Sequence, residues 1–126
     1  AIYSATGKKA ILVSIHCNAA GSGDSWMKAK GWSVFVSNNA SGNSKKLADC
    51  LAQAAECIPV SVRKPMPGQL YWQQNLAICR DSNCPAILTE NFFQDNKDDV
   101  EYLLSREGKD AVARIHIEGV AKYLGL

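Results

Sequence analysis

Two short apolar segments, far apart in the chain, each end in a side chain that can do chemistry. Ile11–Ile15 is followed by His16, and Ala86–Thr89 is followed by Glu90. Short apolar runs between polar residues are typical of buried strands in a parallel sheet. Ligands of open α/β sheets bind beyond the carboxyl ends of the strands. The two segments therefore predict a histidine and a glutamate at one rim of the same sheet.

The rest of the pattern also predicts an α/β fold, and a length of 126 residues suggests one domain. β-Branched and aromatic residues predict a strand over Trp32–Ser37. Apolar residues at helical spacing predict a helix over Lys45–Cys57, capped by Ser44 and ended by Pro59. Further strands are predicted at Ala10–Ile15 and Leu76–Cys79, with an extended stretch at Val60–Lys64. A loop is predicted at Asn91–Lys97, followed by a helix with Asp98 and Asp99 in its first turn. A last helix is predicted at Arg106–Leu124, closed by Gly125.

The five cysteines form no Cys-x-x-Cys pair, which argues against a thiolate zinc site. Cys50 and Cys57 lie about 10 Å apart along the axis of the predicted helix, which is too far for a disulfide. An odd count at these spacings favours buried small side chains in a chain that folds under reducing conditions, with a Cys79–Cys84 bridge left open as an alternative.

The two apolar segments also carry a family resemblance. Ser14–Asn18 reads Ser-Ile-His-Cys-Asn, and Pro85–Asn96 reads Pro-Ala-Ile-Leu-Thr-Glu-Asn-Phe-Phe-Gln-Asp-Asn. They resemble the Ser-x-His-x-Asn and Pro-Ala-x-Leu-x-Glu-x-x-Phe-x-x-Asn stretches of the zinc-dependent N-acetylmuramoyl-L-alanine amidases of bacterial cell-wall turnover and phage lysis. The two motifs in this order, about 70 residues apart, make a fairly specific pair. The likeness runs from about Ala10 to the C-terminus.

This resemblance implies a fold, a cofactor and a reaction. The fold would be a twisted, mostly parallel or mixed sheet with helices on both faces. His16 would be a ligand of one Zn²⁺ ion, which in hydrolases lowers the pKa of a bound water to about 7. Glu90 would be the catalytic base and acid in hydrolysis of the amide between N-acetylmuramic acid and L-alanine in peptidoglycan. Asn18 of the first motif and Arg63, whose guanidinium suits a stem-peptide carboxylate, are the candidates for substrate binding.

The sequence departs from the family before the first motif. The family's other two zinc ligands, a His in a Gly-rich turn and a Glu on the next helix, precede the position of His16. Ala1–Ile15 contains no His and no acidic residue. We therefore expect residues 1–126 to be an N-terminally truncated catalytic domain, with Ala1–Lys9 as the end of an interrupted element. Such a domain would lack the family's first strand and helix, be inactive alone, and expose an edge that favours self-association.

Several other residues invite alternatives. His116 lies on an apolar stripe of the last helix, which favours a core role over metal binding. Cys17 next to His16 could suggest a cysteine hydrolase, but neighbours along a strand point to opposite faces. A non-catalytic module of the same fold that binds cell-wall glycan or peptide is the main alternative function. Four aromatic residues could either contact sugar and peptide or serve as packing residues: Trp26, Trp32, Tyr71 and Trp72.

The expected partner is peptidoglycan. The net charge of +2 is compatible with an anionic cell wall and too small to predict nucleic-acid binding. No apolar run approaches the roughly 20 residues of a membrane span, and no signal segment is visible. The expected location is the cell envelope or outside the cell, in the periplasm or cell wall, or the cytoplasm until release in the case of a phage lysin.

Overall fold

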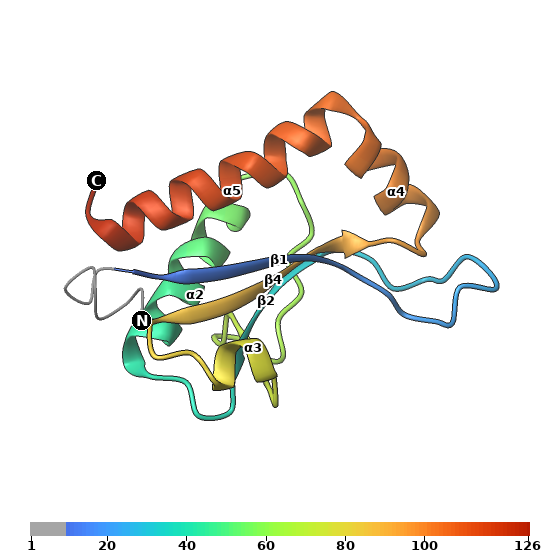
Figure 1. Cartoon of the computed structure of the whole chain (residues 1–126). Helices are drawn as coiled ribbons and strands as arrows, with labels where there is room; N and C mark the ends of the chain where they lie inside the picture. The colour runs from blue at the N-terminus through green and yellow to red at the C-terminus, as the bar shows by residue number, and fades with distance from the viewer. Residues whose placement is uncertain (1–9) are drawn as a thin grey trace.

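Four strands form one open sheet in the order β1-β4-β2-β3 (Figure 1). The strand β1 is parallel to β4, β2 is antiparallel to β4, and β3 is parallel to β2. The computed structural model describes residues 10–126, so the interpretation of Ala1–Lys9 lies outside the described part. The mixed sheet confirms the predicted α/β fold. The strands are β1 (Leu12–Asn18), β2 (Trp32–Ser37), β3 (Trp72–Gln74) and β4 (Ala86–Phe93).

The helices divide between the two faces of the sheet. The long helices α2 (Gly42–Glu56) and α5 (Arg106–Leu124) pack against each other and build the main core with one face. The short helix α3 (Ala77–Arg80) lies on the opposite side of the sheet from α5, where its Cys79 is buried with Ala86 and Leu88 (Figure 1). The helix α4 (Lys97–Leu104) follows β4 directly. Within residues 10–126, no long helix covers the rest of the second face.

The main core comes from the 2-residue period of the strands and the helical period of α2. Fully buried side chains from β2, β4, α2 and α5 meet in it, namely Val34, Val36, Ile87, Leu47, Leu51 and Ile115. At the contact between the two long helices, a Cβ placed on Gly119 would lie only 2.6 Å from Cγ of Leu51. A glycine is therefore required for α5 to lie this close to α2.

The strands that carry His16 and Glu90 are both longer than predicted. The strand β1 continues through His16 to Asn18, and β4 continues through Glu90 to Phe93. The two strands stay paired beyond the apolar residues, which is why the polar positions remain in the ladder. The prediction that His16 and Glu90 lie beyond the strand ends is therefore wrong: they lie on the face of the sheet.

Two other local predictions are wrong. The N-cap of α2 is Ser41, whose side chain accepts a hydrogen bond from the backbone N–H of Ser44. Ser44 itself is inside the helix, and its Oγ accepts a hydrogen bond of 3.0 Å from the backbone N–H of Ala86. The strand predicted over Leu76–Cys79 is instead the single turn of α3, whose backbone bonds start at the carbonyl of Leu76. A single turn, of which only Cys79 is buried, has too few residues to show a helical period.

The remaining elements agree more closely with the sequence. The strand Trp32–Ser37 and the helix Arg106–Leu124 have the predicted bounds, and Gly125 closes the helix with φ of 77°. The stretch Val60–Lys64 pairs only through one bridge between Val62 and Trp32. All five cysteines are free, so Cys79 and Cys84 form no bridge, but the prediction that the cysteines are buried holds only for Cys50 and Cys79 and is wrong for the exposed Cys17 and Cys57. Within residues 10–126, no helix has both the length and the apolar character needed to cross a membrane.

Candidate active site

His16 and Glu90 are neighbours across the pair formed by β1 and β4. They are partners in the register of these parallel strands, so their side chains lie on the same face of the sheet. Ser14 lies two residues before His16 on that face, and its Oγ is 2.7 Å from Nε2 of the imidazole. The Ser-x-His spacing thus places a hydroxyl where it orients the exposed ring of His16.

Glu90 is half-buried, and its other neighbour is Ser33 of β2. Burial raises the pKa of the Glu90 carboxyl, and the nearby His16 opposes this shift to a smaller extent. A raised pKa makes a carboxyl group better able to carry a proton near neutral pH. Glu90 therefore has the environment of a proton carrier, although it lies within a strand.

The residue behind this site is Asn91 of β4, which connects this strand to its two neighbours, β1 and β2. Its side chain accepts a hydrogen bond of 2.8 Å from Nε1 of Trp32 and donates one of 3.0 Å to the backbone carbonyl of His16. It also donates to Oγ1 of Thr89 at 3.0 Å. These buried bonds fix β1, β4 and β2 relative to one another next to Glu90.

The same chain of hydrogen bonds continues to α5 through His116. Oγ1 of Thr89 lies 2.8 Å from Nε2 of His116, and Nδ1 lies 2.7 Å from the carbonyl of Val112. The carbonyl can only accept, so Nδ1 carries the proton and Nε2 accepts from the threonine hydroxyl. Burial lowers the pKa of His116, which fits this neutral form. His116 is thus a core residue with both nitrogens bonded, as predicted from the apolar stripe.

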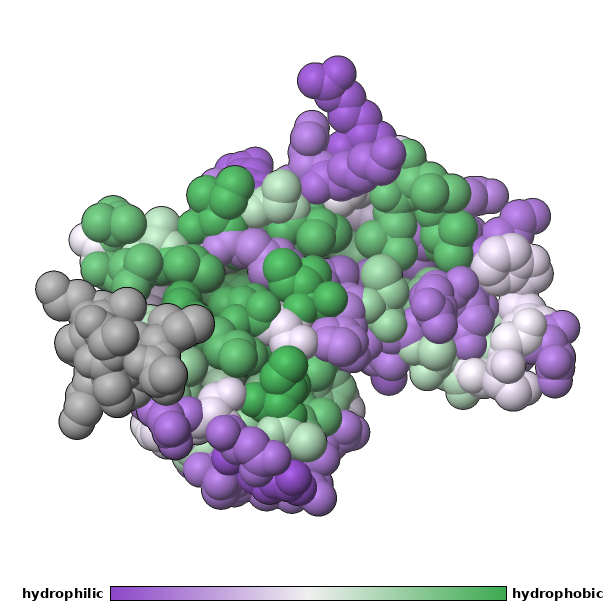
Figure 2. All heavy atoms as spheres, in the orientation of Figure 1, coloured by the Kyte–Doolittle hydropathy of each residue, from purple (hydrophilic) through white to green (hydrophobic). Residues whose placement is uncertain are grey.

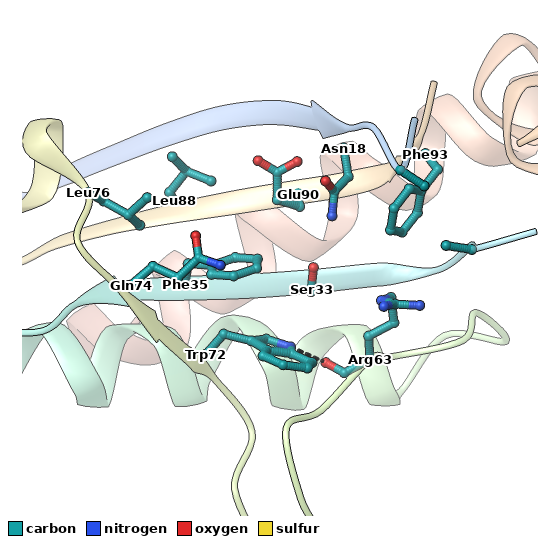
Figure 3. A pocket seen from close by; sticks show the side chains of 12 residues that line it. Asn18, Ser33, Phe35, Arg63, Trp72, Gln74, Leu76, Leu88, Glu90 and Phe93 are labelled. Atoms are coloured by element: carbon teal, nitrogen blue, oxygen red, sulfur yellow. Dashed lines mark hydrogen bonds between the residues drawn. The ribbon is translucent and has the colours of Figure 1, made fainter. Parts of the chain in front are cut away.

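A cavity of about 370 Å³ lies beside Glu90 on the face away from α5 (Figure 3). Its walls include Asn18 from β1, Ser33 from β2 and Arg63 from the segment that follows Pro59. His16 is not among its lining residues and lies on the other side of Glu90, toward the sheet edge. The structure therefore brings Asn18, Glu90 and Arg63 to one cavity, with His16 adjacent.

An irregularity in β4 shapes the end of this cavity. Phe92 has φ of 69°, in the left-handed region that a phenylalanine rarely adopts, and the register of β1 and β4 shifts at this level. Phe92 is buried in the main core against Tyr102, while Phe93 lines the cavity. Strict alternation after Glu90 would have placed Phe92 on the cavity side. Nothing in the residue pattern signals this change.

The loop between β1 and β2 is held in place by two aspartates that are not among the predicted site residues. The carboxylate of Asp95 accepts hydrogen bonds from the backbone N–H groups of Ala20 and Gly21, and these bonds lower its pKa. The buried carboxylate of Asp99 accepts from the backbone N–H groups of Gly31 and Phe93. A run of short acidic side chains directly after a strand was the available signal.

The residues present do not by themselves fit a zinc ion. Among residues 10–126 no group of three His, Cys, Asp or Glu side chains is placed to hold a metal, and residues 1–9 contain none of these residue types. A zinc hydrolase site needs three protein ligands. His16 supplies one donor of the expected type, so two further ligands would be needed to complete such a site.

The structure distinguishes the remaining candidates, namely Cys17 as a nucleophile and the tryptophans as contacts for sugar or peptide. Burial raises the pKa of the Cys17 thiol, with a smaller contribution from Glu90, which disfavours a thiolate nucleophile. Trp32 is fully buried and is a packing residue. Trp72 lines the cavity, and Trp26 is 60% exposed on the loop between β1 and β2.

Comparison with known proteins identifies one family. The family model described as N-acetylmuramoyl-L-alanine amidase matches residues 1–122. An endolysin of Bacillus phage SPP1 is 29% identical over 119 residues, which cover 94% of this chain and 42% of the endolysin. The chain thus spans less than half the length of this curated relative.

Solved structures give the same result. The N-acetylmuramoyl-L-alanine amidase of Clostridium difficile 630 matches with a TM-score of 0.80 and 28% identity, over 99% of this chain and 63% of that chain. The amidase Ami1 of Mycobacterium smegmatis matches with a TM-score of 0.79 and 19% identity, over 99% of this chain and 58% of that chain. The second likeness shows the fold alone, and in both cases the chain spans less than two thirds of the solved protein.

Proposed function

The chain belongs to the N-acetylmuramoyl-L-alanine amidase family, and we propose that its site serves hydrolysis of the amide between N-acetylmuramic acid and L-alanine in peptidoglycan. The observation that carries this proposal is Glu90, half-buried at the side of a cavity, next to His16 in register, with its pKa raised by burial. A carboxyl group of this kind can take a proton from an attacking water and deliver it to the departing amine of L-alanine.

We further propose that the reaction depends on zinc and that His16 is one of its ligands. The metal, when bound, would supply Lewis-acid activation of water or of the amide carbonyl. Because residues 1–126 lack a full ligand set, two more ligands must come from outside these residues. By itself the chain should therefore bind zinc weakly and be inactive. Asn18 and Arg63 are proposed to contact the substrate, since both line the cavity beside Glu90.

The proposal is tested by replacing Glu90 in a longer chain that supplies the two further ligands. Glu90→Gln should lower the release of stem peptide from purified peptidoglycan by about 10²–10⁴-fold, since it removes the proton carrier. Zinc content should stay near that of the unchanged protein. The matched control is Glu101→Gln, an exposed glutamate on α4. Full turnover by the Glu90 variant would defeat the assignment.

The alternative is a non-catalytic module that binds cell-wall glycan or peptide with the same fold. The open cavity is the observation that favours it, because binding needs no metal. Pull-down with insoluble peptidoglycan, together with the absence of stem-peptide release from the longer chain, would support this reading.

We propose that the protein acts at the cell wall, either as an envelope or secreted amidase or as a phage lysin released from the cytoplasm. The relatives from phage and from bacteria support both settings. We also propose self-association through β1. This strand is one of the two edges of the sheet within residues 10–126, and its Ile15 is 61% exposed. An edge strand with an exposed apolar side chain favours pairing with another chain.

A further inference from the structure

The cavity beside Glu90 contains a buried hydroxyl without a partner. Ser33 is only 1% exposed, and its Oγ makes no hydrogen bond within the described part of the chain. Ser33 pairs with Glu90 on the neighbouring strand, and both residues line the cavity (Figure 3). A buried polar group without a bond is costly, and few survive in folded proteins. This hydroxyl is therefore suited to bond a ligand that enters the cavity.

The opposite side of the cavity carries a guanidinium without an acidic partner. Arg63 is half-buried, and within residues 10–126 it forms no ion pair with a carboxylate. Its guanidinium carbon lies 5.0 Å from the ring centroid of Phe93, and its Nη1 donates a long bond of 3.4 Å to the carbonyl of Lys30. Most of its five N–H donors thus remain available to a ligand.

The backbone of Arg63 is fixed from both sides. Its N–H donates to the carbonyl of Trp32 at 2.7 Å, and its carbonyl accepts a bond of 3.1 Å from Nε1 of Trp72. Gly31 packs so closely that a Cβ there would lie 3.1 Å from Cγ of Arg63. The guanidinium therefore extends from a rigid base toward the cavity, where Figure 3 shows it next to Phe93.

The two ends of the cavity consequently differ in charge. Glu90 lies at one end and Arg63 at the other, with Ser33 between them. The backbones that carry Glu90 and Arg63 are separated by the strand β2, which corresponds to about 10 Å, or two strand spacings. In an extended peptide, the second residue after a bond lies about 7 Å from it. A peptide cut at Glu90 would thus bring its second residue toward Arg63.

We propose that Arg63 and Ser33 bind the free α-carboxylate of the second stem-peptide residue, so that the site prefers D-glutamate over its amide, D-isoglutamine, at that position. This inference rests on the proposed function, since it places the scissile amide at Glu90. The second residue of the stem is joined through its γ-carboxyl, which leaves the α-carboxyl either free or amidated. A guanidinium and a hydroxyl bind a carboxylate better than a neutral amide, because the bonds are charge-assisted.

The test compares two soluble ligands that differ only in this group, N-acetylmuramyl-L-alanyl-D-glutamate and N-acetylmuramyl-L-alanyl-D-isoglutamine. Binding to the 126-residue chain is measured by NMR titration, which needs no hydrolysis and follows the fold in the same spectra. We expect the acid to bind at least about tenfold more tightly than the amide. Arg63→Gln should bring the ratio of the two dissociation constants close to 1. Arg63→Lys should retain part of the preference for the acid, because an ammonium group keeps the positive charge but cannot form the two parallel hydrogen bonds of a guanidinium.

Two further variants make the result specific. Ser33→Ala should weaken binding of the acid while leaving some preference. The neighbouring Lys64→Gln, a change of the same charge, should leave the ratio unchanged. Equal binding of the two ligands by the unchanged chain, no binding of the acid at millimolar concentration, or a preference that survives Arg63→Gln in a folded variant would each overturn the proposal. These outcomes are independent of the Glu90 experiment, which alone decides whether the site is hydrolytic.

Discussion

His16 and Glu90 face the same side of the sheet as register partners of two parallel strands, one on the exposed edge and one in the interior. The arrangement gives each residue a different environment. His16 is exposed, whereas Glu90 is half-buried between β1 and β2. A metal ligand at an edge can be joined by donors from another segment, while an interior carboxyl keeps the raised pKa that burial gives it.

Figure 2 shows hydrophobic side chains gathered over the middle of this side of the molecule, where Figure 1 draws β1 and α5, and mostly hydrophilic side chains along its lower part.

The first prediction concerns zinc. The 126-residue chain should show no stoichiometric site of nanomolar affinity in calorimetric titration, because it lacks three ligands in fixed geometry. His16→Ala should remove most of the weak binding that remains, whereas His116→Leu should leave it unchanged. A tight site with one zinc per chain, or release of stem peptide by the isolated chain, would show that other residues complete the site.

The second prediction concerns His116 and pH. Because burial lowers its pKa in the folded state, the unfolded chain binds the proton more strongly. This contribution to the free energy of unfolding is therefore full at pH values above about 6.5 and falls as the pH drops toward the lower folded pKa. His116→Gln should cost about 1–2 kcal/mol at about pH 7.5 and make stability less dependent on pH between about 7.5 and 5.5.

Urea unfolding at the two pH values measures this effect, and an NMR titration of the imidazole gives the pKa directly. A pKa at or above the ordinary value would contradict the neutral form inferred from its bonds to Thr89 and Val112.

The third prediction concerns the contact between α2 and α5. Gly119→Ala should lower the free energy of unfolding by about 1–3 kcal/mol, because the new Cβ overlaps Leu51. The control is Gly42→Ala, also in a helix, where a Cβ would meet nothing within 4 Å. Thermal unfolding of both variants gives the comparison. Equal changes in the free energy of unfolding for Gly119→Ala and Gly42→Ala would mean that α2 and α5 can move apart without loss of stability.

The fourth prediction concerns the edge strand. Sedimentation velocity should show concentration-dependent association of the 126-residue chain, and Ile15→Lys should weaken it at least about tenfold, since a charged side chain on an edge strand opposes pairing. Leu104→Lys changes a side chain that is 71% exposed on α4 and should have no such effect. A chain that stays monomeric at all concentrations would exclude association through β1.

The sequence predicts the strongly patterned elements and misses those set by tertiary contacts. The strand Trp32–Ser37 is rich in β-branched and aromatic residues, and the helix Arg106–Leu124 ends at a glycine. Both elements are confirmed. The helix at Ala77–Arg80 is only one turn long and shows no period in the sequence, and it is anchored by the burial of Cys79 against Ala86 and Leu88.

In the candidate site, too, the sequence predicts the residues that belong to clear motifs and misses those that depend on tertiary contacts. The family motifs single out His16 and Glu90, and the structure places them side by side. Their position within the strands could not be predicted, because polar residues at Glu90 and Asn91 normally indicate the end of a buried strand. A role for Ser33 could not be predicted, because a lone serine in an apolar strand gives no signal until its neighbours in the fold are known.

The attachment of the β1–β2 loop has a consequence for protein engineering. Its two ends depend on the carboxylates of Asp95 and Asp99, which belong to a different part of the sequence. The loop is therefore not a portable module. A chimera that imports residues 19–31 into a related protein should import residues 95–99 in the same step. A graft of the loop alone would leave backbone N–H groups of the new segment without acceptors in the recipient.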